Sequence, residues 1–238
     1  MNAAQFSTGA LVLLPLIAAA CAALMPVAAR RVLGLAVALG CAGFTAAVVS
    51  AVGAGEVVEL SLGGYDAPLG ITLRADGFSV LLVLLTTAVG GLVTLFAAVF
   101  PASTGRRLAS ADDEGTLRWQ GEHPAFWPLW LGCWAGLNAV FVAGDLFNTY
   151  VGLELVGLTA VGLVALGKTD AWHAALRYLF VAVLGSLLFL VAVGLVVSVT
   201  GTLDINQAAG VIAETPESHP VVLAALILLT VGLSLKVA

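Results

Sequence analysis

Two ionisable side chains, Glu154 and Lys236, each stand inside a long apolar run of the sequence. An ionised side chain at the centre of a bilayer costs at least about 2.5–3.5 kcal/mol, so a protein retains one there when it is paired, protonated or needed. Burial favours the neutral form of both groups, whereas an opposite charge nearby favours both charged forms. A glutamate that moves towards and away from a lysine therefore changes how firmly the lysine holds its proton. This chemistry suits the movement of protons through a dry barrier.

Both residues also have a structural interpretation. A neutral glutamic acid at position 154 would hydrogen-bond between helices, and Lys236 would extend its ammonium group to the membrane surface. At 1.5 Å per residue, Glu154 lies about 13 Å along a helix that starts near Asp145, and Lys236 about 22 Å along one that starts near Val221. Depths that differ by about 9 Å on parallel helices allow direct contact only if the last helix has a shifted start or a break.

The composition predicts the elements that position these side chains. Of the 238 residues, 61% are hydrophobic and 10% are charged, whereas a soluble domain carries about 25% charged residues. We therefore expect an all-α integral membrane protein, residues 1–238 forming a single bundle of about seven transmembrane helices. The expected helices are 9–28, 32–52, 77–100, 125–143, 146–166, 176–200 and 221–238. The nine basic residues are scattered, which argues against nucleic-acid binding.

The basic residues between the spans predict an orientation. Seven of the nine fall on one side, Arg74 falls on the other, and Lys236 lies within a span. The positive-inside rule then places the N-terminus outside. Residues 1–6 lack a positive charge, so we expect no cleaved signal peptide. Short alternating runs around Gly-Gly-Tyr-Asp-Ala-Pro within 56–74 predict a small extracytoplasmic β-hairpin between helices two and three, and the mixed inner loop 102–124 predicts a flexible connector.

Other polar residues are weaker candidates. His173 and Arg177 lie in a short amphipathic stretch that is typical of an interfacial anchor, with a place on a secondary proton path as the alternative. Asp145 is typical of a helix cap, with an ion ligand as the alternative. The spacing Gly132-x-x-x-Gly136 permits close helix packing. The cysteines, Cys21, Cys41 and Cys133, form no C-x-x-C pattern, so we expect neither a metal site nor a disulfide framework. The sequence has no ligand set for haem, flavin or iron–sulfur clusters, so we expect no bound cofactor.

Several motifs together resemble a known family. They are Gly-Asp145-Leu-Phe-Asn148, Gly-Leu-Glu154-Leu, Ala-Ala-Leu-Arg177-Tyr-Leu-Phe-Val-Ala-Val-Leu-Gly185-Ser186 and Thr200-Gly-Thr-Leu-Asp204. The combination resembles the antiporter-like subunits, which join the Mrp D branch of multisubunit cation/proton antiporters to proton-pumping subunits of respiratory complex I and membrane-bound hydrogenases. The hairpin sequence Gly-Gly-Tyr-Asp-Ala-Pro-Leu-Gly-Ile, with Arg-Ala-Asp76-Gly-Phe-Ser after it, is most similar to the Mrp D branch.

The resemblance implies roles for particular residues. In this family the fifth helix carries a glutamate and the seventh a lysine that form the ion pair of a proton half-channel, and Glu154 and Lys236 occupy these positions. The seventh helix of the family is interrupted near its lysine, and Arg177 falls near another basic position. Relatives contain two inverted repeats, whereas this sequence ends two residues after Lys236. We therefore expect a correspondence with the N-terminal half alone, either as a piece of a longer product or with another chain that supplies the C-terminal half.

Three hypotheses follow. The first is a proton-translocating subunit of a multisubunit Mrp-type Na⁺/H⁺ antiporter in the cell membrane, with other membrane subunits and the lipid bilayer as partners. The second is a redox-inactive proton-pumping subunit in the membrane arm of an NADH-quinone oxidoreductase or a hydrogenase. The third is a structural half-subunit that conducts no ions. Glu154 and Lys236 separate the first two from the third, because only conduction requires both residues.

Overall fold

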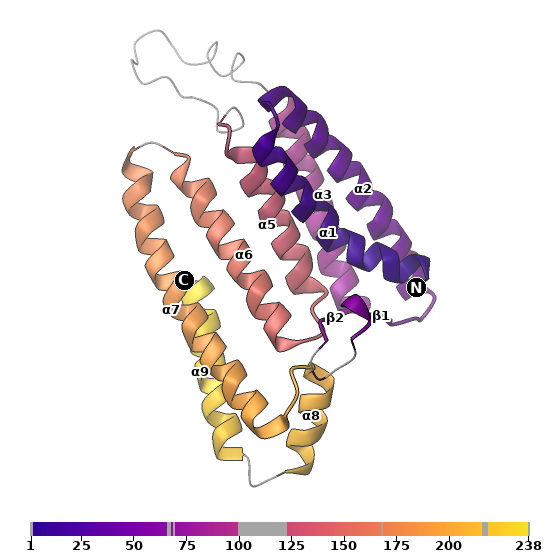
Figure 1. Cartoon of the computed structure of the whole chain (residues 1–238), viewed down its shortest axis with the longest axis vertical. Helices are drawn as coiled ribbons and strands as arrows, with labels where there is room; N and C mark the ends of the chain where they lie inside the picture. The colour runs from indigo at the N-terminus through magenta and orange to yellow at the C-terminus, as the bar shows by residue number, and fades with distance from the viewer. Residues whose placement is uncertain are drawn as a thin grey trace.

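The computed structural model describes residues 2–65, 68, 70–99, 123–167, 169–215 and 219–237. Eight α-helices within these ranges form an elongated bundle with a small hairpin at one side (Figure 1). The helices are α1 (Ala3–Leu24), α2 (Val27–Gly53), α3 (Gly77–Val99), α5 (Phe126–Phe141), α6 (Leu146–Ala165), α7 (Thr169–Thr200), α8 (Ile205–Glu214) and α9 (His219–Val237). Residues 102–122 of the inner connector, and the basic residues Arg106, Arg107, Arg118 and Lys168 that entered the orientation, lie outside the described residues.

The predicted helical class is confirmed in its coarser form. Among the described residues, five helices are long and apolar enough to cross a membrane: α1, α2, α3, α6 and most of α7. The other two expected spans are shorter, because α5 has 16 residues and the apolar part of α9 is Pro220–Lys236. The first expected boundary was wrong by several residues. The chain turns at Met25 and Pro26, and Pro26 caps α2, which suits a residue without a backbone N–H at a helix start.

Helix α8 was not predicted. It starts at Asp204, whose carboxylate accepts hydrogen bonds from the backbone N–H groups of Asn206 and Gln207. Side-chain oxygens commonly accept hydrogen bonds from the free backbone N–H groups at a helix start in this way. The helix has only ten residues, a length at which apolar runs do not suggest a membrane span. Helix α8 therefore connects α7 to α9 without adding another membrane crossing.

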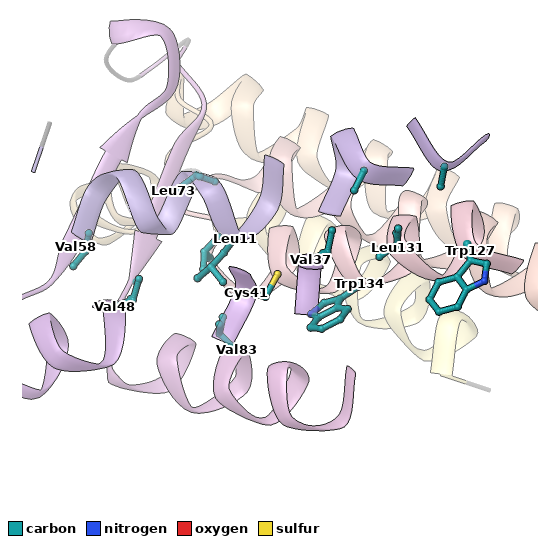
Figure 2. Close-up of a cluster of buried hydrophobic side chains, with 14 of the residues drawn as sticks. Leu11, Val37, Cys41, Val48, Val58, Leu73, Val83, Trp127, Leu131 and Trp134 are labelled. Atoms are coloured by element: carbon teal, nitrogen blue, oxygen red, sulfur yellow. The ribbon is translucent and has the colours of Figure 1, made fainter. Parts of the chain in front are cut away.

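The first bundle, which we define as α1, α2, α3 and α5, has a continuous hydrophobic core. Figure 2 shows Trp127, Trp134 and Leu131 of α5 within this cluster. The rings of Trp127 and Trp134 lie against glycines of neighbouring helices, Gly34 and Gly90. A Cβ atom at Gly90 would lie 2.8 Å from the Trp134 ring. Interlocking of large rings with glycines therefore fixes how α5 packs on α2 and α3.

A polar contact inside the first bundle follows from one proline. Pro15 lies inside α1 and has no N–H group, so the carbonyl of Leu11 loses its partner four residues on. The side chain of Asn138 on α5 donates to this carbonyl at 2.8 Å, and Asn138 is fully buried. A buried carbonyl without a partner is costly. Asn138 therefore makes the proline in α1 tolerable and ties α1 to α5.

The predicted β-hairpin is present. Strand β1 (Val58–Ser61) pairs antiparallel with β2 (Thr72–Ala75), with Val58 opposite Ala75. The backbone of β2 also bonds to the segment before α6: the Gly144 N–H donates to the Thr72 carbonyl at 2.8 Å and the Arg74 N–H donates to the Val142 carbonyl at 2.7 Å. The hairpin thus extends beyond its own two strands and contacts the connection between α5 and α6.

The same connection also bonds to the chain after α7. The Leu146 N–H donates to the Leu203 carbonyl at 3.0 Å, and the Ile205 N–H donates to the Gly144 carbonyl at 3.2 Å. We call these contacts between segments 72–74, 142–146 and 203–205 the hairpin junction. It joins the hairpin to the starts of α6 and α8, and so links the first bundle to a second bundle, which we define as α6, α7, α8 and α9.

Candidate functional site

Glu154 lies on helix α6, and a side-chain cap fixes the start of this helix. Asp145 caps the helix: one carboxylate oxygen accepts the Asn148 N–H at 2.6 Å, and the other accepts the Thr72 N–H at 3.2 Å. Burial is the main reason that the pKa of Asp145 is raised, and Asp204 raises it further. The prediction of Asp145 as a cap is therefore confirmed. Glu154 follows nine residues later, about 13 Å along the helix, and its side chain is 24% exposed.

Close contacts between glycines and backbone hold α6 against α5. A Cβ atom at Gly136 would lie 3.0 Å from the backbone nitrogen of Val156, and one at Gly152 would lie 3.1 Å from that of Val140. The glycines therefore allow the two helix backbones to approach, as the spacing around Gly136 predicts. The opposite side of α6 packs against α7, so the helix that carries Glu154 lies between two neighbours (Figure 1).

Helix α9 carries Lys236 and packs along α7. The two backbones meet at Gly185 and Gly232, where a Cβ atom on either residue would lie 2.6 Å from the other's carbonyl oxygen. Gly232 is one helical turn before Lys236, and a Cβ atom at Gly185 would lie 3.5 Å from Lys236 Cγ. This crossing of α7 and α9 therefore sets the position from which the lysine side chain extends towards α6.

Glu154 and Lys236 form an ion pair. Lys236 Nζ lies 2.9 Å from Glu154 Oε1, and the lysine side chain is only 11% exposed. The ammonium group also lies beside Gly157, one turn after Glu154 on α6. Two opposite charges with so little exposure attract each other more strongly than two charges at the surface. If they separate, each charge is left in apolar surroundings.

A shifted start brings the two residues to the same level. Helix α9 is continuous from His219 to Val237, so no break precedes Lys236. In Figure 1 the start of α9, in yellow, lies nearer the lower end of the molecule than the start of α6 does, and α9 runs beside the lower part of α7. Of the two solutions that helix geometry left open, the described structure therefore has the displaced start and not the interruption.

Sequence reasoning did not select Ser186 of α7, which contacts this pair. Its hydroxyl forms a hydrogen bond with Glu154 Oε1, the oxygen that Lys236 also contacts. The same hydroxyl lies 3.0 Å from the Ala182 carbonyl oxygen, and Ser186 is 3% exposed. The only sequence signal was its place after Gly185 in a quoted motif, because serine is common on helices and carries no charge.

The structure does not bring His173 and Arg177 to the pair. Both side chains are exposed, and they precede Ser186 on α7 by 13 and 9 residues, which is about 20 and 13 Å along the helix. Their place on a secondary proton path stays a prediction. Among the described residues, no group of three histidine, cysteine or acidic side chains is arranged to hold a metal ion.

These features define a class of protein. A multi-pass helical membrane protein holds a lysine–glutamate pair on helices that also carry close glycine crossings. Residues 143–238, which include both members of the pair, match the family described as NADH:quinone oxidoreductase/Mrp antiporter, transmembrane. Over these residues the chain is similar to this family of antiporter-like membrane subunits.

Individual relatives show the same similarity. The chain is 32% identical over 176 residues to the D-type component of the Na⁺/H⁺ antiporter of Alkalihalophilus pseudofirmus, covering 74% of this chain and 32% of that protein. It is 33% identical over 184 residues to the N-type component of the NADH-quinone oxidoreductase of Desulforudis audaxviator, covering 77% and 34%. The chain thus spans about a third of the length of these curated relatives. Its fold matches a chain of the Mrp complex from Dietzia sp. with a TM-score of 0.77 at 25% identity, covering 98% of this chain and 41% of that one.

Proposed function

We propose that this chain is a proton-translocating subunit, or part of one, of an Mrp-type cation/proton antiporter in the cell membrane. The observation that carries the proposal is the Glu154–Lys236 ion pair, held at 2.9 Å between α6 and α9, whose sequences contain no other Asp, Glu, Lys or Arg. The relatives from Na⁺/H⁺ antiporters, whose names describe that exchange, favour the antiporter branch. Other membrane subunits are the proposed partners, since the structural match is to a chain within a complex.

In this proposal, Glu154 controls how firmly Lys236 holds its proton. While the carboxylate is ionised and in contact, its charge stabilises the ammonium form of the lysine. When Glu154 binds a proton or moves away, the ammonium group stays in apolar surroundings without a counter-charge, and Lys236 releases its proton to the next acceptor. When the carboxylate returns, Lys236 takes up a proton again. The cycle needs only two side chains and a small change in their separation.

The proposal includes an orientation. Seven membrane crossings, with α5 and α9 as the two short ones, place the N-terminus outside and the β-hairpin on the outer face. The distribution of basic residues in the sequence supports this orientation. Helix α9 then runs from outside to inside in parallel with α6, so the two halves of the ion pair come from parallel helices.

A second candidate is a proton-pumping subunit in the membrane arm of a quinone-reducing complex. The 33% identity to the NADH-quinone oxidoreductase relative favours it. The proposed work of Glu154 and Lys236 is the same in both complexes, and the difference lies in what drives it. Cation-dependent proton movement in vesicles without a redox substrate would favour the antiporter, and proton movement that requires a quinone and an electron donor would favour the second candidate.

The test is the substitution of each member of the pair in the complete complex. We expect Lys236→Ala to lower Na⁺-dependent proton movement in inverted vesicles at least tenfold, and Glu154→Gln to lower it less, because the lysine can still bind a proton. Ser234→Ala is the matched control on α9: its hydroxyl is exposed and bonds to the Thr230 carbonyl of its own helix. Wild-type transport in assembled Lys236→Ala complexes would overturn the proposal and favour a structural role.

A further inference from the structure

Ser186 has more hydrogen-bond acceptors than it can satisfy at one time. Its Oγ lies within hydrogen-bonding distance of Glu154 Oε1 and of the Ala182 carbonyl oxygen. A hydroxyl group has one proton to donate, and both neighbours are acceptors while Glu154 is ionised. The proton of Ser186 must therefore point to one of them, and the charge of Glu154 decides which.

The ionised carboxylate is the stronger acceptor. Hydrogen bonds to a charged group are about twice as strong as neutral ones, so the hydroxyl donates to Glu154 Oε1 while that residue is ionised. Once Glu154 carries a proton, Oε1 becomes an ordinary neutral acceptor, and the Ala182 carbonyl at 3.0 Å competes with it. Ser186 keeps a hydrogen bond in both states by rotation of its hydroxyl alone, which needs no repacking of the helices.

The position of Ser186 is also fixed from the other side. Its neighbour Gly185 lies in the crossing with Gly232 of α9, so the backbone of α7 cannot shift here without moving α9. Lys236 and Ser186 then approach the same oxygen of Glu154, one from α9 and one from α7. Within the described part of the chain, the donors that contact the Glu154 carboxylate all bond to Oε1, which leaves Oε2 as its open oxygen.

Few other ionisable groups surround Glu154. Among the residues whose side chains are described, the ionisable ones on the helices around it are Tyr150 on α6, Cys133 on α5, Lys236 on α9, and His173, Arg177 and Tyr178 on α7. Tyr150 stacks on Phe189, and Cys133 contacts Thr159. Lys236 is the charged side chain that contacts the carboxylate. A shift in the protonation of Glu154 after a change at position 186 therefore has few other sources.

We propose that Ser186 is a positioning residue of the proton site, which holds the ionised carboxylate of Glu154 through its hydroxyl and turns to the Ala182 carbonyl when Glu154 binds a proton. This inference rests on the proposed function of the Glu154–Lys236 pair. Its consequence is that Ser186 stabilises the ionised form of Glu154 more than the protonated form.

The experiment is the pH profile of cation-dependent proton movement in vesicles that contain the complete complex. Glu154→Gln identifies the limb of the profile that depends on Glu154. In Ser186→Ala the ionised carboxylate loses a donor, so we expect this limb to move towards higher pH by roughly 0.5 to 1 unit. Ser186→Thr keeps a hydroxyl on Cβ and should restore the wild-type midpoint.

The control is Ser198→Ala on the same helix, where the hydroxyl is exposed and bonds to the Leu195 carbonyl. Its midpoint should match that of wild type. An unshifted midpoint in Ser186→Ala, a uniform loss of rate at every pH, or an equal shift in Ser186→Thr would each overturn the role of Ser186. If Lys236→Ala and Glu154→Gln leave transport intact, the proposed function itself fails, and this outcome is distinguishable because it does not involve position 186.

Discussion

The two bundles of this chain hold their helices together in different ways. The first bundle packs tryptophan rings against glycines and buries a continuous apolar core, with Asn138 satisfying a carbonyl that Pro15 leaves free. The second bundle has a much smaller apolar cluster, centred on Ala192, Val196, Ala208 and Ala225. It holds α7 and α9 together by a crossing of two glycines and carries its ion pair between α6 and α9. Rigid packing and ionisable chemistry are therefore separated between neighbouring sets of helices.

This difference predicts where a substitution affects stability rather than transport. Trp134→Ala removes a ring that is 1% exposed and packs on Gly90, and we expect a loss of about 3–5 kcal/mol of stability. Thermal unfolding of the detergent-purified complex measures it. Complexes that remain folded should retain transport, because the ring packs on α3 in the first bundle.

Trp172→Ala is the matched control, since this tryptophan of α7 is 60% exposed. Its effect on unfolding should be within about 0.5 kcal/mol. If Trp134→Ala abolished transport in complexes of normal stability, the separation of roles between the two bundles would be wrong.

A smaller change tests the second bundle. In Gly232→Ala the added Cβ atom would lie 2.6 Å from the Gly185 carbonyl oxygen. The oxygen belongs to one helix backbone and the Cβ atom is bonded to the other, so neither can yield locally. Helix α9 must then move away from α7 and carry Lys236 with it. We expect a several-fold loss of transport in assembled complexes, measured as cation-dependent proton movement.

Gly194→Ala on α7 provides the comparison, because an added Cβ atom there meets nothing within 4 Å. Alanine is the better helix former by about 1 kcal/mol, so Gly194→Ala should leave transport unchanged and stability equal or higher. Equal transport in the two variants would show that the glycine crossing does not position Lys236.

The smallest expected effect lies at the hairpin junction, between the bundles. Because burial raises the pKa of Asp145 above its ordinary value, the folded form holds this proton more tightly than the unfolded form. The resulting stabilisation is complete below the ordinary value of 3.8 and is lost as the pH rises through the raised value. We therefore expect the protection of the Thr72 and Asn148 amides from hydrogen exchange to fall a few-fold across this window.

Asp145→Asn should remove that pH dependence, after correction for the intrinsic exchange rates. Amides of α5 are the internal control, because this helix ends before the hairpin junction. A pH dependence that persists in Asp145→Asn would assign the effect to another group, such as Asp204.

Most of the helices could be predicted from the sequence, but their offsets along the helix axes could not. Apolar length predicts that a segment crosses a membrane. It predicted the helix that carries Glu154, and Asp145 also marks the start of that helix. It does not predict the axial offset between helices, because that depends on connections such as α8. The contact between Glu154 and Lys236 therefore followed from the residue types and the family resemblance, while the displaced start of α9 that permits it required the structure.

Ser186 was beyond sequence reasoning for a different reason. A charged residue in an apolar run is conspicuous because its burial is costly, whereas a serine in a helix can satisfy its hydroxyl on its own backbone. Ser198, Ser234 and Thr230 do so in this chain. Only the packing of α7 on α6 distinguishes Ser186 from these residues.

The hairpin junction holds one end of α6, so that the helix can pivot about that end. Backbone hydrogen bonds to β2 and to the start of α8 fasten the helix at residues 142–146, so a tilt of α6 pivots near Asp145 and displacement grows with distance along the helix. Glu154 lies about 13 Å from this pivot, where a tilt of about 10° moves a side chain by about 2 Å. That displacement is comparable to the length of the contact it would break, so a small angular movement of one helix is enough to open the ion pair.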